Sequence, residues 1–264
     1  MSYVYGQIVP WHIQPGVLIA SYIVSLIGAI TTVELLHRHQ SGRGWLTWYV
    51  FASYYSLACL IYHRLHRSGI AISFGLVAIW CMHFVGNRAI IMGNGDESFQ
   101  LFYNSGFTAL SAILPVVFLL FGFSLVELRQ PGQRYFWPML VTSGFCAGLA
   151  IVGMHYVGNF GISNYKVNNP PAFICGAAAI AVSACILALS LFFYFRERWI
   201  NNVMRRLSCA CVLACAVSGM HWVATVGTSY RLKPITNTRA SDRNTNLIVA
   251  IVIVRFPTAF YPLI

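Results

Sequence analysis

The sequence CMHFVGN occupies residues 81–87; it returns as GMHYVGN at residues 153–159 and, more loosely, as GMHWVAT at residues 219–225. Each copy places a methionine, a histidine, an aromatic residue and a valine in succession. The motif methionines, Met82, Met154 and Met220, are 72 and 66 residues apart. Because every copy lies inside an apolar run, the repetition predicts a fold assembled from similar membrane-embedded units.

The composition places this 264-residue chain among membrane proteins. Hydrophobic residues make up 58% of it and charged residues only 9%, whereas a soluble domain carries roughly 25% charged residues. Since a membrane-spanning helix needs about 20 apolar residues, the chain holds about seven spans and no separate soluble catalytic domain. The net charge of +11 comes from short basic clusters between apolar runs, a pattern typical of membrane-protein loops and not of nucleic-acid-binding surfaces.

Seven apolar segments are predicted to be membrane-spanning helices, at residues 16–36, 69–92, 107–128, 135–159, 172–195, 203–226 and 246–263. We therefore expect an all-α polytopic membrane protein, with residues 1–264 forming one domain. Arginines cluster after the first, third and fifth segments, so the positive-inside tendency predicts an extracellular N-terminus and a cytoplasmic C-terminus. All three Met-His motifs then lie at the outer ends of the second, fourth and sixth helices.

A glutamate near the inner end of the preceding helix repeats with the motif, at Glu34, Glu127 and Glu197. The predicted architecture is therefore three two-helix repeats plus one closing helix. The first repeat is longer because of residues 45–67, an aromatic-rich insertion expected to be either an interfacial segment or a gene-model artefact such as a retained intron. The closing segment ends in RFPTAFYPLI, where an arginine and two prolines interrupt the helix, so a truncated C-terminus is also expected.

The Met-His pairs predict a metal site. A histidine inside a spanning helix marks a functional site by default. Thioethers suit Cu(I), and imidazoles suit copper, zinc and iron. Adjacent residues on a helix project about 100° apart, so a shared site needs ligands from several helices. The candidate ligands are Met82, His83, Met154, His155, Met220 and His221.

Simpler explanations exist for each residue taken alone. A membrane histidine often makes an interhelical hydrogen bond, and a methionine usually packs. Asn87 and Asn159 are expected either to cap helix ends or to hydrogen-bond the ligands. The motif aromatics, Phe84, Tyr156 and Trp222, are expected to be interfacial anchors. Four glycines are expected to let helices approach closely: Gly75, Gly148, Gly153 and Gly219.

On these motifs the chain resembles the MHYT domain family, and the form IWCMHFVGNRAI is similar to its fungal branch. The resemblance implies a seven-helix sensor domain of the plasma membrane. It further implies copper bound through the motif methionines and histidines, and a diatomic gas (O2, CO or NO) as the sensed ligand. Family members often carry another methionine five positions after the motif methionine, where this chain has Asn87, Asn159 and Thr225.

The leading interpretation is a copper-binding sensory membrane protein that signals to a cytoplasmic tail or partner. A haem b protein that uses two of the motif histidines as axial ligands is one alternative. A copper transporter is another, and a receptor for an external ligand is a third. An enzyme is not expected, because the sequence shows no nucleophile–base pair and no phosphate-binding loop.

Overall fold

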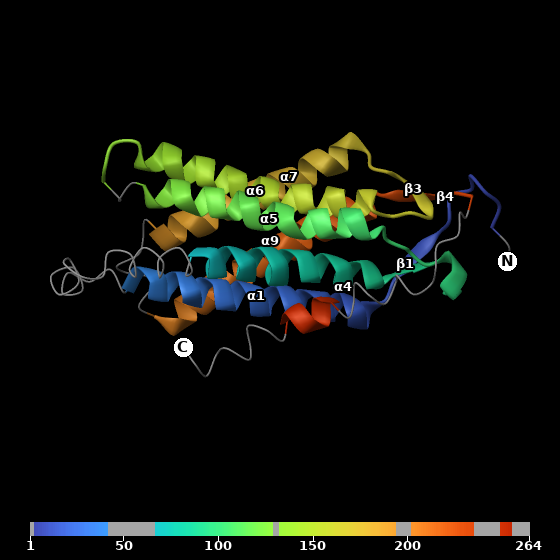
Figure 1. Cartoon of the computed structure of the whole chain (residues 1–264), viewed down its shortest axis with the longest axis horizontal. Coiled ribbons are helices and arrows are strands. Elements are labelled where there is room, and N and C mark those ends of the chain that lie inside the picture. Colours follow the sequence, from blue (N-terminus) through green and yellow to red (C-terminus); the bar gives the residue numbers. More distant parts are fainter. Residues whose placement is uncertain (1–2, 42–66, 129–131, 194–201, 235–248, 255–264) are drawn as a thin grey trace.

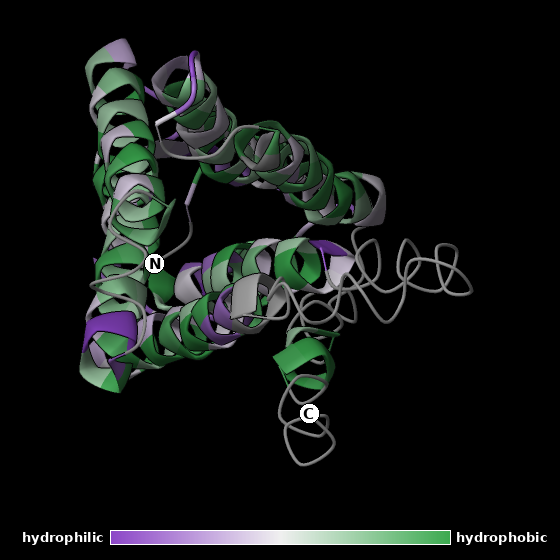
Figure 2. Cartoon of the chain, turned by 90° about the vertical axis from the view of Figure 1, so that its left-hand side faces the viewer, coloured by the Kyte–Doolittle hydropathy of each residue, from purple (hydrophilic) through white to green (hydrophobic). Residues whose placement is uncertain are grey.

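The structure is a computed structural model, and it describes residues 3–41, 67–128, 132–193, 202–234 and 249–254. Six helices in this part of the chain are long and apolar enough to cross a membrane: Pro15–His37, Arg67–Arg88, Ser105–Val126, Phe136–Phe160, Pro171–Phe193 and Val203–Val226. They run side by side along the long axis of the molecule (Figure 1). Hydrophobic residues predominate along their lengths (Figure 2). The predicted multi-pass helical membrane class is thereby confirmed.

The helices pack into a closed ring. Its members, in order round the ring, are α1 (Pro15–Ser41), the π-helix η1 (Ser73–Cys81) continued by α4 (Met82–Arg88), α5 (Ser105–Glu127), α6 (Phe136–Phe160), α7 (Pro171–Phe193) and α9 (Val203–Val226). Each packs mainly against its two ring neighbours, and α9 closes the ring against α1. The motif helices therefore alternate with helices that carry no motif.

The motif helices also turn inward. Within their apolar windows, the spans Arg67–Arg88, Phe136–Phe160 and Val203–Val226 have 78%, 50% and 56% of their residues buried. The three alternate spans have only 33%, 33% and 28%. The motif helices also contact one another directly. Three two-helix units thus place their motif helices round a common axis, with the other three helices outside them.

Glycines set some of the helix separations. A Cβ at Gly148 would lie 2.7 Å from the Val182 Cα atom of α7, so α6 and α7 approach closely at this position. Gly75 and Gly153 likewise face side chains of α5, at 3.1 Å from Val116 and Leu114. The same expectation for Gly219 is wrong for the described part of the chain, where no atom lies within 4 Å of its Cβ position. That glycine occupies a face of α9 without a close neighbour.

Four short strands close one end of the bundle, and they are the part of the fold that hydropathy did not predict. Strand β1 (Trp11–Ile13) pairs antiparallel with β2 (Ile90–Met92), and β3 (Tyr165–Asn168) with β4 (Ser229–Leu232). The predicted second helix was too long, since α4 ends at Arg88 and Ile90–Met92 form β2. An apolar run supports either conformation, and pairing with β1 satisfies the backbone of these residues.

Buried polar side chains hold these strands to the loop before α5. We call β1–β4 together with residues 93–104 the strand cover. The Gln100 side chain bonds both the N–H and the carbonyl of Met92, each at 3.2 Å. Asn164 donates to the Gln100 carbonyl at 2.6 Å and accepts from the Phe102 N–H at 3.1 Å. The Tyr165 hydroxyl donates to the Phe99 carbonyl at 2.5 Å, and burial raises its pKa, so it stays protonated.

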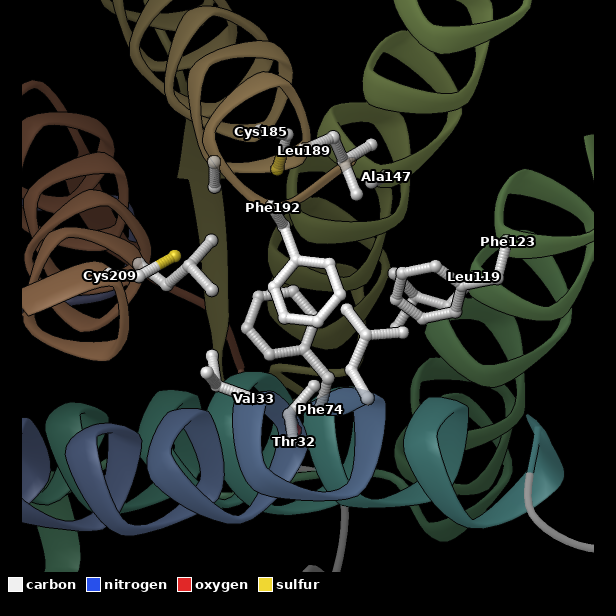
Figure 3. A pocket seen from close by; sticks show the side chains of 13 residues that line it. Thr32, Val33, Phe74, Leu119, Phe123, Ala147, Cys185, Leu189, Phe192 and Cys209 are labelled. Carbon is white, nitrogen blue, oxygen red and sulfur yellow. The ribbon is translucent and has the colours of Figure 1, made fainter. Parts of the chain in front are cut away.

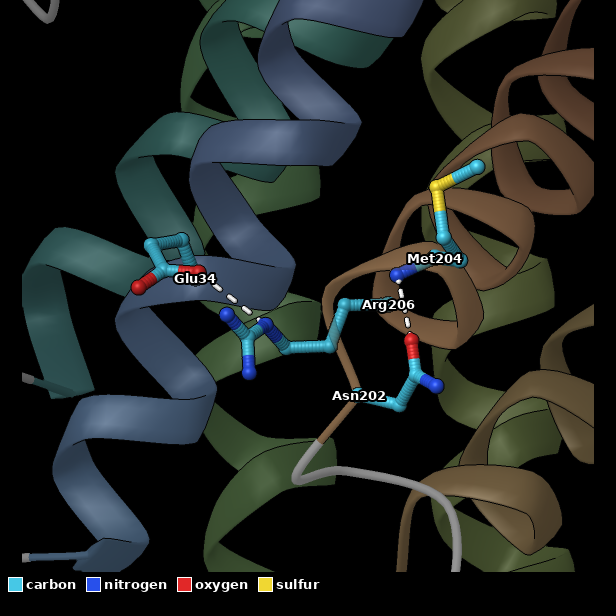
Figure 4. A network of polar contacts seen from close by, with 4 residues as sticks. All are labelled: Glu34, Asn202, Met204 and Arg206. Atoms are coloured by element: carbon cyan, nitrogen blue, oxygen red, sulfur yellow. Dashed lines mark hydrogen bonds and ion pairs between the residues drawn. The ribbon is translucent and has the colours of Figure 1, made fainter.

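The opposite end of the bundle carries an ion pair. The Arg206 Nε atom lies 3.2 Å from Glu34 Oε2, which joins α9 to α1 (Figure 4). The Asn202 side chain caps α9 by accepting a hydrogen bond from the Met204 N–H at 2.9 Å. Glu34 is thus placed near the end of its helix, as its repeat predicts. The Glu127 side chain and Glu197 lie outside the described part of the chain.

Two predictions fall largely on residues that the structure does not describe. The insertion at 45–67 is one, of which only Arg67 is described. The closing helix at 246–263 is described only at residues 249–254, which are helical. At that helix the Cys81 thiol donates to the Ala250 carbonyl at 3.6 Å, so the segment packs against the first motif helix. The predicted truncation at the C-terminus lies outside the described residues.

Candidate metal centre

The three motif histidines come from the final turns of three inward-facing helices, just before the strand cover. His83 is the second residue of α4, directly after the nine-residue π-helix η1. His155 and His221 lie on the regular helices α6 and α9. A π-helix is wider than an α-helix and recurs at functional sites. The motif helix of the first repeat therefore has a different backbone conformation before its histidine from the motif helices of the other two repeats.

The three imidazole rings form a nearly equilateral triangle. Their centroids are 5.0 Å apart for His83 and His155, 5.2 Å for His83 and His221, and 5.1 Å for His155 and His221. The rings stand nearly perpendicular to one another, with interplanar angles of 82°, 88° and 80°. All three side chains are completely buried. The repeat in the sequence is thus an approximate threefold arrangement in space.

The Nδ1 atoms of His83 and His155 both approach the Nδ1 atom of His221. The Nδ1 atom of His221 lies 3.3 Å from that of His83 and 3.2 Å from that of His155. Two nitrogens bound tetrahedrally to one ion at about 2.0 Å would themselves be about 3.3 Å apart. The spacing therefore fits three imidazoles that share one metal ion.

The outer ring nitrogens distinguish the third histidine from the other two. Asn87 Nδ2 lies 3.1 Å from His83 Nε2, and Asn159 Nδ2 lies 3.0 Å from His155 Nε2. Of the two roles expected for these asparagines, the structure places their amides on the histidines four residues earlier. Thr225 stands at the equivalent position of the third motif. The buried Nε2 atom of His221 has no hydrogen-bond partner among the described residues.

The motif glycines make room for the rings. A Cβ at Gly86 would lie 2.8 Å from His221 Nε2, and a Cβ at Gly158 would lie 2.7 Å from His83 Nε2. Each glycine thus packs against the histidine of another repeat, and Ala224 stands at the third equivalent position. The sequence analysis did not assign a role to Gly86 or Gly158. The shared VGN triplet that follows two of the three motifs was the available signal.

The other motif residues surround the rings. Met82, Met154 and Met220 are completely buried in the apolar core, on positions that project about 100° from their histidine neighbours. Phe84 is not an interfacial anchor as expected, because it is buried and packs edge to face on Tyr103. Tyr156 and Trp222 are half-buried and stand edge to face beside His155 and His221.

The donor set fits a transition metal. Among histidine, cysteine and carboxylate side chains of the described residues, His83, His155 and His221 form the group that could hold an ion. Neutral imidazoles suit copper, zinc and iron, whereas calcium and magnesium require oxygen ligands. Within the described ranges His221 Nε2 and Asn159 Oδ1 have no hydrogen-bond partner, so the polar groups described here do not fully satisfy one another. This is the pattern expected of a ligand-binding site.

A family described as a bacterial signalling protein N-terminal repeat, MHYT, matches residues 77–137 and again residues 148–203. Each matched repeat contains one Met-His motif, the first at His83 and the second at His155. The match therefore follows the repeat that the structure shows.

Two curated relatives are similar to this chain. The bifunctional diguanylate cyclase/cyclic di-GMP phosphodiesterase MucR of Pseudomonas aeruginosa is 28% identical over 221 residues, which is 82% of this chain and 28% of that protein. The signaling protein YkoW of Bacillus subtilis is 24% identical over 154 residues, or 58% of this chain and 18% of that protein. The chain thus spans less than a third of the length of either relative.

No solved structure matches this chain. The two family matches each contain one of the motif histidines that meet in the core of the bundle. Both curated relatives are also longer proteins that contain a region similar to this chain. On these grounds the chain contains two MHYT repeats, at residues 77–137 and 148–203, and its long apolar helices make it a multi-pass integral membrane protein.

Proposed function

We propose that this chain is a membrane sensor domain that binds copper through His83, His155 and His221. The observation that carries the proposal is the convergence of three buried Nδ1 atoms, two pairs of which lie at 3.2 and 3.3 Å. Imidazoles at this separation suit one ion. Met82, Met154 and Met220 are buried in the core around the site, about 100° round their helices from these histidines, and they remain candidate ligands in this proposal.

The proposed sensed ligand is a diatomic gas: O2, CO or NO. Three imidazole ligands leave a coordination position open, as in metal sites that accept an exogenous ligand. All three rings have no exposed surface, so a small and uncharged ligand is favoured over a bulky or ionic one. The ion supplies the gas-binding centre, and the histidines hold it between three helices. A change in the copper oxidation state is the second signal that such a site would report.

The alternatives fit the geometry less well. A haem iron needs two axial nitrogens about 2.0 Å from it on opposite faces, which is about 4 Å in all, and the observed 3.2 and 3.3 Å are shorter. A copper transporter would need ligands at several depths. In the half of the bundle away from the motifs, the structure instead has a cavity of about 40 Å³ lined mainly by apolar side chains such as Phe74, Leu119 and Phe192 (Figure 3).

The proposed role is binding and signalling, without catalysis. Both named relatives are much longer than this chain, and one of them is a cyclic di-GMP enzyme by name. By analogy, this chain would pass its metal state to a further segment or to a cytoplasmic partner. We place it in the plasma membrane with the strand cover outside, on the basis of the arginine-rich sequence between the paired helices. The lipid bilayer is then its main surroundings.

The decisive experiment is the copper content of detergent-purified protein after loading with Cu(I). Wild type is compared with a His83→Ala/His155→Ala/His221→Ala variant and with His12→Ala, a control at an exposed position on β1. We expect about one copper per chain in wild type and control, and none in the triple variant with unchanged helical circular dichroism. Copper retained by the triple variant, or a haem absorption band in the wild type, would refute the assignment.

A further inference from the structure

The hydrogen bonds of the three rings define which nitrogen carries the proton on each ring. An amide Nδ2 group can only donate, so His83 Nε2 and His155 Nε2 must accept from Asn87 and Asn159. A neutral imidazole carries one proton, and the nitrogen that accepts does not bear it. The protons of His83 and His155 therefore reside on Nδ1.

The third ring must then have the opposite arrangement. His83 and His155 both direct a protonated Nδ1 at the Nδ1 atom of His221, at 3.3 and 3.2 Å. His221 Nδ1 accepts, so its proton resides on Nε2, which is the buried atom without a partner. This one arrangement of protons explains all four hydrogen bonds and the nitrogen that has no partner among the described residues. The sequence agrees, because the third motif has Thr225 in place of asparagine.

We infer that Asn87 and Asn159 are positioning residues that, in the protein without metal, hold His83 and His155 as Nδ1–H donors to the Nδ1 atom of His221. Metal binding then requires both asparagine side-chain amides to rotate, so that their oxygens face the Nε2 atoms. The first half concerns the protein without metal. The second half rests on the copper-binding function proposed above. Neither asparagine is a ligand in this scheme.

Metal binding requires this rotation because a ligand nitrogen must offer a lone pair. With Nδ1 as the ligand atom, the protons of His83 and His155 must be on Nε2, where the side-chain oxygen of each asparagine can accept them. Each ring loses one proton from Nδ1 and gains one at Nε2, with water as the carrier, so each ring remains neutral. Asn159 Oδ1 has no partner among the described residues, so reversing this amide breaks only its bond to His155.

The asymmetry predicts an order of events. His221 Nδ1 already carries no proton, so His221 becomes the first ligand when the ion displaces the two N–H donors from it, and the reversal of the two amides follows. Asn87 precedes β2 by three residues and Asn159 precedes β3 by six. The rearrangement therefore occurs directly beneath the strand cover, at two of its three attachments to motif helices.

The test is nitrogen-15 NMR of the full chain, labelled at histidine, in lipid nanodiscs after removal of metal by a chelator. The chain has eight histidines, and single His→Gln variants assign the three signals. We expect Nδ1–H tautomers for His83 and His155 and an Nε2–H tautomer for His221. Addition of Cu(I) should convert His83 and His155 to Nε2–H and leave His221 as Nε2–H. Three Nε2–H tautomers in the metal-free protein would overturn the inference.

A matched pair of variants separates positioning from folding. Asn159→Thr copies the residue of the third motif, and we expect His155 to lose its Nδ1–H preference while His83 keeps its own. Asn168→Thr, at an exposed position on β3, should leave every tautomer unchanged. An unaltered His155 tautomer in Asn159→Thr would refute the role of the amide.

The two proposals fail in different ways. If the metal-free tautomers are as inferred but Cu(I) does not bind, the positioning role of Asn87 and Asn159 stands. The rotation of their amides on metal binding and the copper function are then both refuted. If Cu(I) binds to rings that were Nε2–H from the start, the copper function stands and the positioning role of the two asparagines is wrong.

Discussion

At the scale of single residues, the site depends on Gly86 and Gly158, each of which leaves room for a histidine ring from a neighbouring helix. Gly158 lies on α6 and packs against the ring of His83, which belongs to another repeat. Any side chain at this position would be too close to the His83 Nε2 atom and would disturb its hydrogen bond with Asn87. The adjacent Gly158 and Asn159 of GMHYVGN therefore act together: Gly158 leaves room for the ring of His83, and Asn159 hydrogen-bonds His155 of its own helix.

Gly158→Ala should displace His83 from the triangle. The added Cβ would lie 2.7 Å from Nε2, inside van der Waals contact, and overpacking of this kind destabilises by about 1–3 kcal/mol. We expect copper affinity to fall at least tenfold, measured by competition with a Cu(I) chelator. Gly176→Ala is the control, because its Cβ would meet only Val223 at 3.9 Å, and alanine favours helix. Equal affinities in the two variants would contradict this role for Gly158.

At the scale of helices, the ring is closed at both ends by different interactions. The strand cover binds the motif end through main-chain hydrogen bonds, and the Glu34–Arg206 pair joins α1 to α9 at the other. Both partners are largely shielded, with side-chain exposures of 25% and 15%. Because α9 carries His221, this pair connects the outer helix of the first repeat to the motif helix of the third.

Glu34→Gln should weaken the bundle without altering the metal site. The substitution removes one charge from a partly shielded pair, and such pairs contribute on the order of 1 kcal/mol. We expect a lower thermal midpoint in detergent, together with unchanged copper content, because Glu34 lies at the other end of the helices. Glu97→Gln, at an exposed position within the strand cover, should leave the midpoint unchanged. Loss of copper in Glu34→Gln would instead show that the two ends are coupled.

At the scale of the whole molecule, the site formed by His83, His155 and His221 is fully buried. The helix ring surrounds it, and the strand cover follows directly on the three motif helices (Figure 1). Two isolated bridges, between Ile8 and Arg231 and between Tyr103 and Ile162, tie the two sheets and the loop before α5 into one cover. Under the proposed copper-binding function, metal entry and release would require local opening of the cover, and its buried polar contacts would set how often this happens.

Asn164→Ala should accelerate that opening. The variant removes bonds to Gln100 and Phe102 and leaves buried backbone groups without partners, which costs about 1–3 kcal/mol. We expect copper to be lost to an excess of chelator at least tenfold faster than from wild type, followed by absorbance of the copper–chelator complex. Asn168→Ala on β3 is the matched control at an exposed position. Equal release rates would show that the cover does not limit access.

The sequence by itself determined the membrane class, the repeat and the three histidines, because apolar segment length and motif spacing are local properties of a chain. It also limited Asn87 and Asn159 to two roles. Tertiary structure decided between these roles, since a hydrogen bond from Asn159 to His155 depends on how α6 faces the other motif helices. The strands at Ile90–Met92 and Ser229–Leu232, the distance between Nδ1 atoms and the fit of Gly158 to His83 depend on contacts between residues far apart in the chain. Hydropathy and spacing carry no information about such contacts.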